Sequence, residues 1–240
     1  MRSNRHRIEV PVTCYLIEHP KGNILFDTGF DKSVEGIKYD MPGFMRKNKV
    51  AVPNVPTGYT IDNRLKALGF KSKDIDYVIL SHLDGDHAGG LHMVKNAKNI
   101  IVSESELKAA KKISVRYNSK FWKDTLIKPF TFKNSPIGPE NKAFDLFEDG
   151  SIILVHTPGH SKGLTSILVN SLIDNKYIVL AGDVGDVRMN WEKLILPGII
   201  DNKAKALSSL KWLQGISYNE NCKGIFVNHD PEIVKREIDL

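Results

Sequence analysis

The sequence predicts an α/β protein. Its 240 residues are 41% hydrophobic and 26% charged, which is ordinary usage for one large globular domain or two small ones. Short apolar runs of strand length alternate with amphipathic helical stretches, and they group into two halves that each run from strands to a helix. No linker-like segment separates the halves. We therefore expect a single domain over residues 1–240.

Charge and cysteine content narrow the class of protein. The net charge is +6, but lysine and arginine are scattered, so we expect no nucleic-acid partner. The two cysteines, Cys14 and Cys222, lie in no metal-binding or redox motif, which favours a reducing compartment. The apolar stretch from Val10 to Ile17 is too short for a signal segment, and no run reaches the roughly 20 apolar residues of a membrane span. We expect a soluble, cytoplasmic protein without a membrane partner.

The first predicted element is a β-hairpin. A loosely alternating strand from Glu9 to Glu18 is followed by a turn at His19–Gly22 and a strand at Asn23–Phe26. The second strand ends at Asp27, which is either an ordinary turn former or a carboxylate that fixes a neighbouring loop.

The segment from Phe30 to Tyr59 has no periodicity. A long irregular stretch of this kind predicts a lid or a substrate wall, and Met41, Phe44 and Met45 would be its apolar face or plain core. The segment around Trp122 could pack on it and supply an apolar substrate pocket.

Capping residues and apolar periodicity predict the remaining elements. In the first half, a helix is predicted over Asn63–Leu68, capped by Thr60 or Asp62 and closed by Gly69. Two strands follow at Tyr77–Leu80 and Asn99–Val102, and Ser103 then precedes a helix at Leu107–Lys112. The second half begins with an irregular segment from Tyr117 to Gly138 and a hairpin of Phe144–Phe147 and Ser151–Val155. Further strands are predicted at Leu164–Val169, Tyr177–Leu180 and Gly224–Val227. Before the last strand, Asp201 is predicted to cap a helix that buries Ala206, Leu207, Leu210 and Leu213.

Four side chains of metal-binding type follow the predicted strand at Tyr77–Leu80. They are His82, Asp84, Asp86 and His87. In an extended chain His82 and Asp84 point to the same side, and a turn at Gly85 re-aims the other two. One loop can thus serve two adjacent ions, which predicts a dinuclear metal site. The alternative is a polar turn with two incidental histidines.

Three further candidate ligands stand where later apolar runs end. They are His160 in the segment Thr157–Ser161, Asp183 after Gly182, and His229 after Asn228. A core or surface histidine is the alternative for His160 and His229. The recurrence of imidazole and carboxylate at strand ends supports metal binding.

Together these motifs resemble the metallo-β-lactamase superfamily, and their order and spacing are most similar to its N-acyl-homoserine lactonase-like hydrolases. The resemblance extends from the first hairpin to His229. It implies a four-layer αββα sandwich with the metals at one edge between the two sheets. The motifs are Asp27-Thr28-Gly29, His82–His87, Thr157–His160, Gly182-Asp183 and Asn228-His229.

The resemblance also implies a role for each motif residue. Six side chains would bind two ions, with His82, Asp84 and His160 on the first and Asp86, His87 and His229 on the second. Asp183 would bridge the ions, and Asp27 would orient the loop that carries the histidines. Asp86 and Asp183 would be the catalytic carboxylates.

Two positions depart from the family pattern. Asp84 stands where most of the superfamily has a histidine, and a carboxylate moves the first site towards harder ions, so manganese and iron(II) are alternatives to zinc. Asp186 stands where lactonase-like relatives often have a tyrosine that donates a hydrogen bond to the substrate carbonyl or oxyanion. An ionised carboxylate cannot donate, so Asp186 either binds substrate or metal, or is a loop residue without a role.

The functional prediction is a dinuclear metal-dependent hydrolase. Two ions about 3.5–4 Å apart would share a water and lower its pKa towards roughly 7, and a metal-bound hydroxide would open a lactone or cleave a small carboxylic ester. The alternatives are a glyoxalase II-type thioesterase, a phosphodiesterase, and a catalytically idle metal-binding sensor. The partner would be a small-molecule substrate. The acyl chain and the oligomeric state stay open, with a homodimer among the options.

Overall fold

The structure, a computed structural model, describes residues 9–31, 33, 53–112, 116–233 and 237–240. The chain divides into two compact units with one β-sheet each, and the predicted α/β class is confirmed. Unit 1 comprises Met1–Thr13, Asn134–His160 and Ser166–Leu240, and unit 2 comprises Cys14–Lys133 and Ser161–Thr165. The two units therefore do not follow the order of the chain, because each contains a short segment from the other's half of the sequence.

Unit 2 contains a five-stranded sheet in the order β1-β2-β3-β4-β5. The first pair is antiparallel, as predicted for the hairpin, and the other pairs are parallel. The first strand is shorter than predicted, since Glu9–Thr13 belongs to unit 1. The strands are β1 (Tyr15–Ile17), β2 (Ile24–Phe26), β3 (Tyr77–Ile79), β4 (Asn99–Ser103) and β5 (Lys128–Phe130).

Helices α2 and α4 contribute to the hydrophobic core of unit 2. Alternate residues of β3 and β4, such as Val78 and Ile100, pack in one buried cluster with Leu65 of α2 and Leu107 of α4. Trp122 belongs to this core, so the structure does not support a substrate pocket at that residue. The helical elements are α2 (Ile61–Ala67), η2 (Ser72–Asp74), α3 (Gly85–Ala88), η3 (Leu91–Val94), α4 (Glu104–Ala110) and η4 (Ser119–Phe121).

Unit 1 contains a six-stranded sheet in the order β11-β10-β9-β8-β7-β6. The hairpin β7–β8 is antiparallel, as predicted. Strands β9 and β10 also pair antiparallel, whereas β11 pairs with β10 in parallel. The strands are β6 (Lys133–Asn134), β7 (Lys142–Asp145), β8 (Ile152–His156), β9 (Thr165–Asn170), β10 (Tyr177–Gly182) and β11 (Cys222–Val227).

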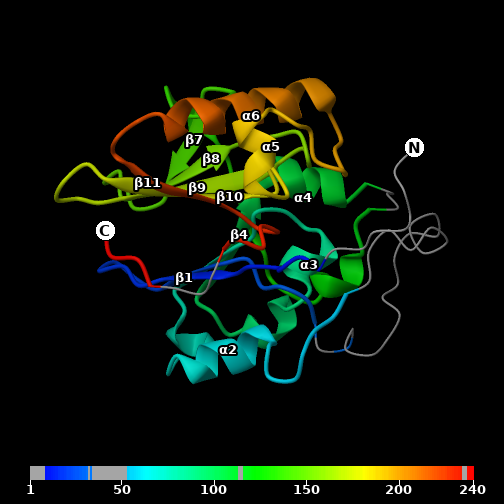
Figure 1. Cartoon of the computed structure of the whole chain (residues 1–240). Coiled ribbons are helices and arrows are strands. Elements are labelled where there is room, and N and C mark those ends of the chain that lie inside the picture. The colour runs from blue at the N-terminus through cyan, green and yellow to red at the C-terminus, as the bar shows by residue number, and fades with distance from the viewer. Residues whose placement is uncertain (1–8, 32, 34–52, 113–115, 234–236) are drawn as a thin grey trace. The chain divides into compact units, whose positions relative to one another are not determined.

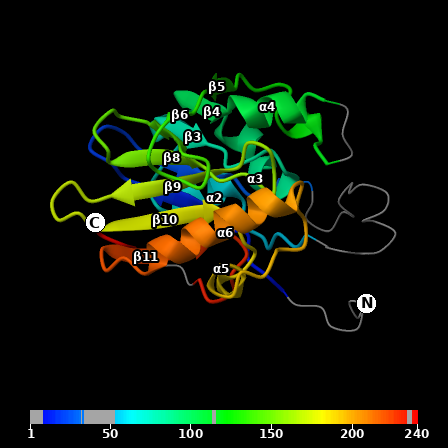
Figure 2. The same ribbon diagram turned by 90° about the horizontal axis from the view of Figure 1, so that it is seen from above.

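Two helices accompany this sheet, α5 (Arg188–Glu192) and α6 (Lys203–Ser217). Helix α6 lies along one face of the sheet of unit 1 (Figures 1 and 2) and contacts β11. Its apolar face is buried at Ala206, Leu210 and Leu213. The predicted cap is wrong by one residue, because the Asn202 side chain, not that of Asp201, accepts a hydrogen bond from the helix backbone.

The predicted lid residues Met41, Phe44 and Met45 lie outside the described part of the chain. Among the described residues, no helix is both long enough and apolar enough to cross a membrane.

Candidate metal centre

The loop after β3 carries the first set of candidate ligands. Ser81 and His82 are fully buried, and Gly85 begins the short helix α3, whose first turn contains Asp86 and His87. The backbone N–H and the hydroxyl of Thr28 both donate to the His87 carbonyl at 2.8 Å. The loop after β2 thereby holds α3 in place.

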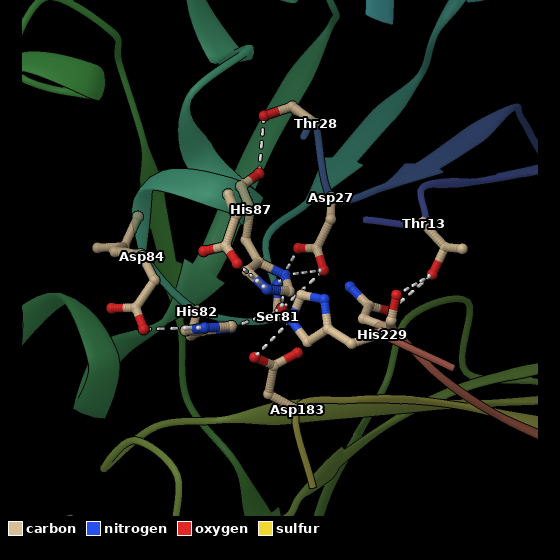
Figure 3. Close-up of polar contacts among 12 residues, drawn as sticks. Thr13, Asp27, Thr28, Ser81, His82, Asp84, His87, Asp183 and His229 are labelled. Carbon is tan, nitrogen blue, oxygen red and sulfur yellow. Dashed lines mark hydrogen bonds and ion pairs between the residues drawn. The ribbon is translucent and has the colours of Figure 1, made fainter. Parts of the chain in front are cut away.

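Asp27 organises this loop. Its carboxylate is fully buried and accepts hydrogen bonds from the Ser81 backbone N–H (2.7 Å), the Ser81 hydroxyl (2.7 Å) and His87 Nδ1 (2.8 Å), as Figure 3 shows. Its backbone has φ of 61°, a conformation that non-glycine residues rarely adopt and that concentrates at functional sites. Asp27 therefore restrains both Ser81 and the ring of His87.

These contacts determine which ring nitrogen carries the proton. A carboxylate only accepts, so His87 Nδ1 is protonated. The Ser81 hydroxyl donates to Asp27 and therefore accepts from His82 Nδ1, 2.9 Å away. The Nε2 atoms of the two histidines then present lone pairs, and they lie 3.4 Å from Asp84 Oδ2 and 3.7 Å from Asp86 Oδ2 respectively.

Asp84 has a second partner that the sequence did not predict. Arg116 donates from Nε to Oδ1 and from Nη2 to Oδ2, both at 2.7 Å, in a bidentate ion pair. Both side chains are largely shielded, at 18% and 15% exposed. The guanidinium therefore offsets the negative charge of Asp84.

In unit 1, the loop after β8 carries His160. Its Nδ1 donates to the Ile199 carbonyl at 2.8 Å, and its Nε2 lies 3.5 Å from Asp183 Oδ2. The loop packs on the start of α6, where a Cβ on Gly159 would meet the Cα atom of Ala206 at 2.3 Å. Only glycine fits this close approach, which fixes the backbone beside His160.

Asp183 and His229 follow the paired strands β10 and β11. His229 Nδ1 donates to the Pro11 carbonyl at 2.9 Å, and its Nε2 lies 3.2 Å from Asp183 Oδ2 (Figure 3). The hydroxyl of Thr13 donates to the Asn228 carbonyl at 3.0 Å. The N-terminal segment of unit 1 thus supports the loop that carries His229.

The four histidines share one arrangement: Nδ1 donates to an acceptor of the same unit, and Nε2 lies 3.2–3.7 Å from a carboxylate oxygen. A neutral imidazole of this tautomer faces the carboxylate with a lone pair, so two acceptors oppose each other. A shared cation removes this repulsion. Imidazole nitrogen and carboxylate oxygen are the donors of zinc and related divalent ions, and hydrogen-bonded Nδ1 atoms are usual behind them. The donor sets of both units therefore fit divalent metal ions.

The cysteines do not extend this donor set. Burial, and next the negative charge of Asp27, raise the pKa of the Cys14 thiol to about 12. Burial likewise raises the pKa of Cys222. A protonated thiol is neither a good ligand nor a good nucleophile at neutral pH, so the histidines and carboxylates carry the chemistry.

Asp186 contacts a different part of unit 1, the backbone at Gly198. The residue is half-buried, and its Oδ2 accepts a long hydrogen bond of 3.3 Å from the Gly198 backbone N–H.

Sequence reasoning missed Ser81, Arg116 and the carbonyls of Pro11 and Ile199. Ser81 directly precedes His82, so its position in the sequence could have indicated a hydrogen bond to a ligand. Arg116 lies 32 residues from Asp84, and a backbone carbonyl leaves no mark on the sequence, so neither carried a local signal.

Comparison with known proteins agrees with this geometry. Residues 7–184 match the family described as the metallo-beta-lactamase superfamily, a range that contains every candidate ligand except His229. The chain is 28% identical over 227 residues to the N-acyl homoserine lactonase AttM of Agrobacterium fabrum (93% of this chain, 83% of that protein). It is 29% identical over 229 residues to the N-acyl homoserine lactonase AiiA of Bacillus thuringiensis subsp. kurstaki (94% and 83%).

Solved structures give the same picture. An N-acyl homoserine lactone hydrolase with N-hexanoyl-L-homoserine bound at its catalytic metal centre matches with a TM-score of 0.74 at 30% identity, over 93% of this chain and 82% of that one. The dizinc quorum-quenching lactonase AidC matches with a TM-score of 0.64 at 18% identity, which shows likeness of fold alone. The matches that cover 93% of the chain extend over residues of both units.

Proposed function

The chain belongs to the metallo-β-lactamase superfamily, and we propose that it is a dinuclear metal-dependent hydrolase that opens N-acyl homoserine lactones. The observation that carries the proposal is the arrangement of the four histidines, each with Nδ1 donating and Nε2 facing a carboxylate. The lactone substrate is supported by relatives that cover over nine-tenths of the chain and are named as lactonases. They do not favour a thioesterase, a phosphodiesterase or an idle sensor.

We assign the donors of both units to one centre in a single hydrolase domain. The support is membership of the metallo-β-lactamase superfamily, whose model matches residues 7–184 and so covers six of the seven predicted ligands. The first ion would be held by His82, Asp84 and His160, and the second by Asp86, His87 and His229, with Asp183 shared between them. Asp84 contributes less than a free carboxylate, because both of its oxygens accept from Arg116.

When bound, two divalent ions polarise a carbonyl oxygen and acidify water. The protein supplies the carboxylates that move protons. Asp86 is the more accessible of the two catalytic candidates, with a side chain 28% exposed against 5% for Asp183. We therefore assign Asp86 Oδ2 to accept a proton from the attacking water. It would return this proton to the alkoxide that forms when the ring C–O bond of the lactone breaks. Asp183 Oδ2 lies 3.5 Å from His160 Nε2 and 3.2 Å from His229 Nε2 and would be the ligand common to both ions.

Zinc is the metal that we propose, because imidazole nitrogens form more than half of the assigned side-chain donors and suit zinc, while Arg116 offsets the harder ligand Asp84. Manganese and iron(II) remain the alternatives. We also propose a cytoplasmic location, which two free thiols support. Asp186 would leave the oxyanion without the donor that a tyrosine provides, so we expect slower turnover than a site that has one.

A substrate panel tests the proposal. Protein loaded with zinc would be given N-hexanoyl homoserine lactone, a small acyl thioester and a bis-aryl phosphodiester. Hydrolysis of each would be measured by the protons that it releases. We expect the lactone to give the highest kcat/KM, and His87→Ala to abolish most of that activity. The control is His92→Ala, since His92 is an exposed histidine outside the motif. A kcat/KM for the thioester or diester above that for the lactone would contradict the assignment.

A further inference from the structure

Glu106 is a fully buried carboxylate outside the assigned ligands and proton carriers. It lies in the first turn of α4, where Ser103 caps the helix by accepting from the Glu106 backbone N–H at 3.2 Å. In a complete capping box the Glu106 carboxylate would reach back to the helix start. Here its two oxygens accept hydrogen bonds from two other loops, at Leu83 and at Ser161–Gly163.

The two oxygens of Glu106 accept from two different ligand-bearing segments. Oε1 accepts from the Leu83 backbone N–H at 3.3 Å. Oε2 accepts from the Ser161 hydroxyl at 2.8 Å and from the Gly163 backbone N–H at 2.9 Å. Leu83 lies between His82 and Asp84, and Ser161 directly follows His160.

From these contacts we propose that Glu106 is a positioning residue of the first metal site, which holds the segment after His82 and the segment after His160 on one carboxylate. This inference rests on the proposed function, since it takes His82, Asp84 and His160 as ligands of the first ion. It assigns Glu106 no contact with metal or substrate.

The segment Ser161–Thr165 is attached to unit 2 at further points. The Ser103 hydroxyl donates to the Gly163 carbonyl at 2.7 Å, and the Thr165 backbone N–H donates to the Ser81 carbonyl at 3.0 Å. A Cβ on Gly163 would meet the Glu106 nitrogen at 2.2 Å and Ser103 Oγ at 2.4 Å. The backbone of this segment therefore runs directly against the start of α4, in reach of the Glu106 side chain.

The chemistry at Glu106 requires a carboxylate. Two backbone N–H groups and one hydroxyl point at its oxygens, and a carboxylate accepts all three. A glutamine would place its NH₂ group against one of these donors, so either Leu83 or the Ser161–Gly163 segment would be released.

The second metal site has supports of its own. Its ligands Asp86 and His87 are in α3, which Asp27 and Thr28 hold from the loop after β2. Loss of the Glu106 contacts should therefore weaken the binding of one ion and leave the other. A residue that only stabilises the fold would weaken both ions together or neither.

The test is metal binding by Glu106→Gln, measured by zinc titration of the chelated full chain against a competing chromophoric chelator. The matched control is Glu104→Gln in the same turn, because the Glu104 side chain is 43% exposed and pairs with Lys108 at 2.9 Å. We expect one of two zinc ions to bind about 10–100-fold more weakly in Glu106→Gln, the usual effect of losing a contact behind a ligand. The other ion should bind as in the wild type, and Glu104→Gln should change neither.

The cobalt(II) form gives a second measurement, because its visible spectrum reports ligand geometry at each site. The spectrum of the weakened site should change and that of the other should not. Equal losses at both sites, or no loss, would overturn the positioning role. Ser161→Ala removes one donor and should give the same site-selective effect at smaller size, which keeps the proposal testable if Glu106→Gln does not fold. A wild-type chain that binds fewer than two ions would instead contradict the proposed function.

Discussion

At the scale of single residues, the candidate site depends on where protons are held. A histidine Nδ1 donates to each of Asp27, Ile199 and Pro11. The Ser81 hydroxyl donates to Asp27 and accepts from His82 Nδ1, so it links the two side chains. Hydrogen bonds to a charged group contribute about 1.5–3 kcal/mol, so the buried Asp27 is a strong restraint on the ring of His87. The imidazoles are thus oriented before any ion binds.

Asp84 and Arg116 provide a test at this scale. Asp84→Ala removes the bidentate carboxylate from a largely shielded guanidinium, so the chelated protein should lose about 1–3 kcal/mol of unfolding free energy in urea. The double variant Asp84→Ala/Arg116→Met should recover part of this loss, because it removes both charges.

Metal affinity separates the ion-pair role of Asp84 from its role as a ligand. We expect both Asp84 variants to bind one ion more weakly, and Arg116→Met alone to bind it more tightly, since Asp84 is then free of its competing cation. Wild-type affinity in the double variant would show that Asp84 pairs with Arg116 and does not bind metal.

At the scale of secondary-structure elements, α6 fixes the loop that carries His160. The Ser209 hydroxyl donates to the Pro158 carbonyl at 2.8 Å, and the backbone N–H groups of Asp201 and Asn202 donate to the Gly159 carbonyl at 2.8 and 3.0 Å. The helix therefore acts on the site through the backbone of two residues that precede a candidate ligand.

Gly159→Ala tests this packing. Its Cβ would collide with the backbone of α6, which costs about 1–3 kcal/mol, and φ of 143° adds about 1–3 kcal/mol of strain. Gly215→Ala, at an exposed position of the same helix with open space around it, should instead add up to about 1 kcal/mol. Urea unfolding of the chelated variants measures both. Equal stability of the two variants would show that α6 does not restrain the loop.

Local patterns predicted most elements, and distant contacts explain the failures. The hairpin β7–β8 was readable from apolar runs around a Glu-Asp-Gly turn. Helix α5 was missed, since its first N–H, from Arg188, is capped by Asp230 from another segment at 2.8 Å. The candidate ligands stand directly after apolar runs and were found for that reason. Arg116 and Glu106 act on loops far away in sequence and left no local pattern.

At the scale of the whole molecule, the chain distributes its candidate ligands over two units that exchange segments. Residues 9–13 support His229 in unit 1, and Ser161–Thr165 is attached to unit 2 directly after His160. If both donor sets bind the same ions, metal binding must couple to folding. Ligand at 100 times its Kd adds about 2.7 kcal/mol to stability, so chelation should lower Tm by several degrees.

The most direct test of the central claim is the metal content of the purified chain after dialysis, measured by inductively coupled plasma mass spectrometry. We predict about two divalent ions per chain in the wild type, and fewer in both His87→Ala of unit 2 and His160→Ala of unit 1, with a lower Tm in each. His92→Ala, which changes an exposed histidine, should keep both ions. Full metal content in either ligand variant, or a wild type that holds no tightly bound ion, would contradict the account.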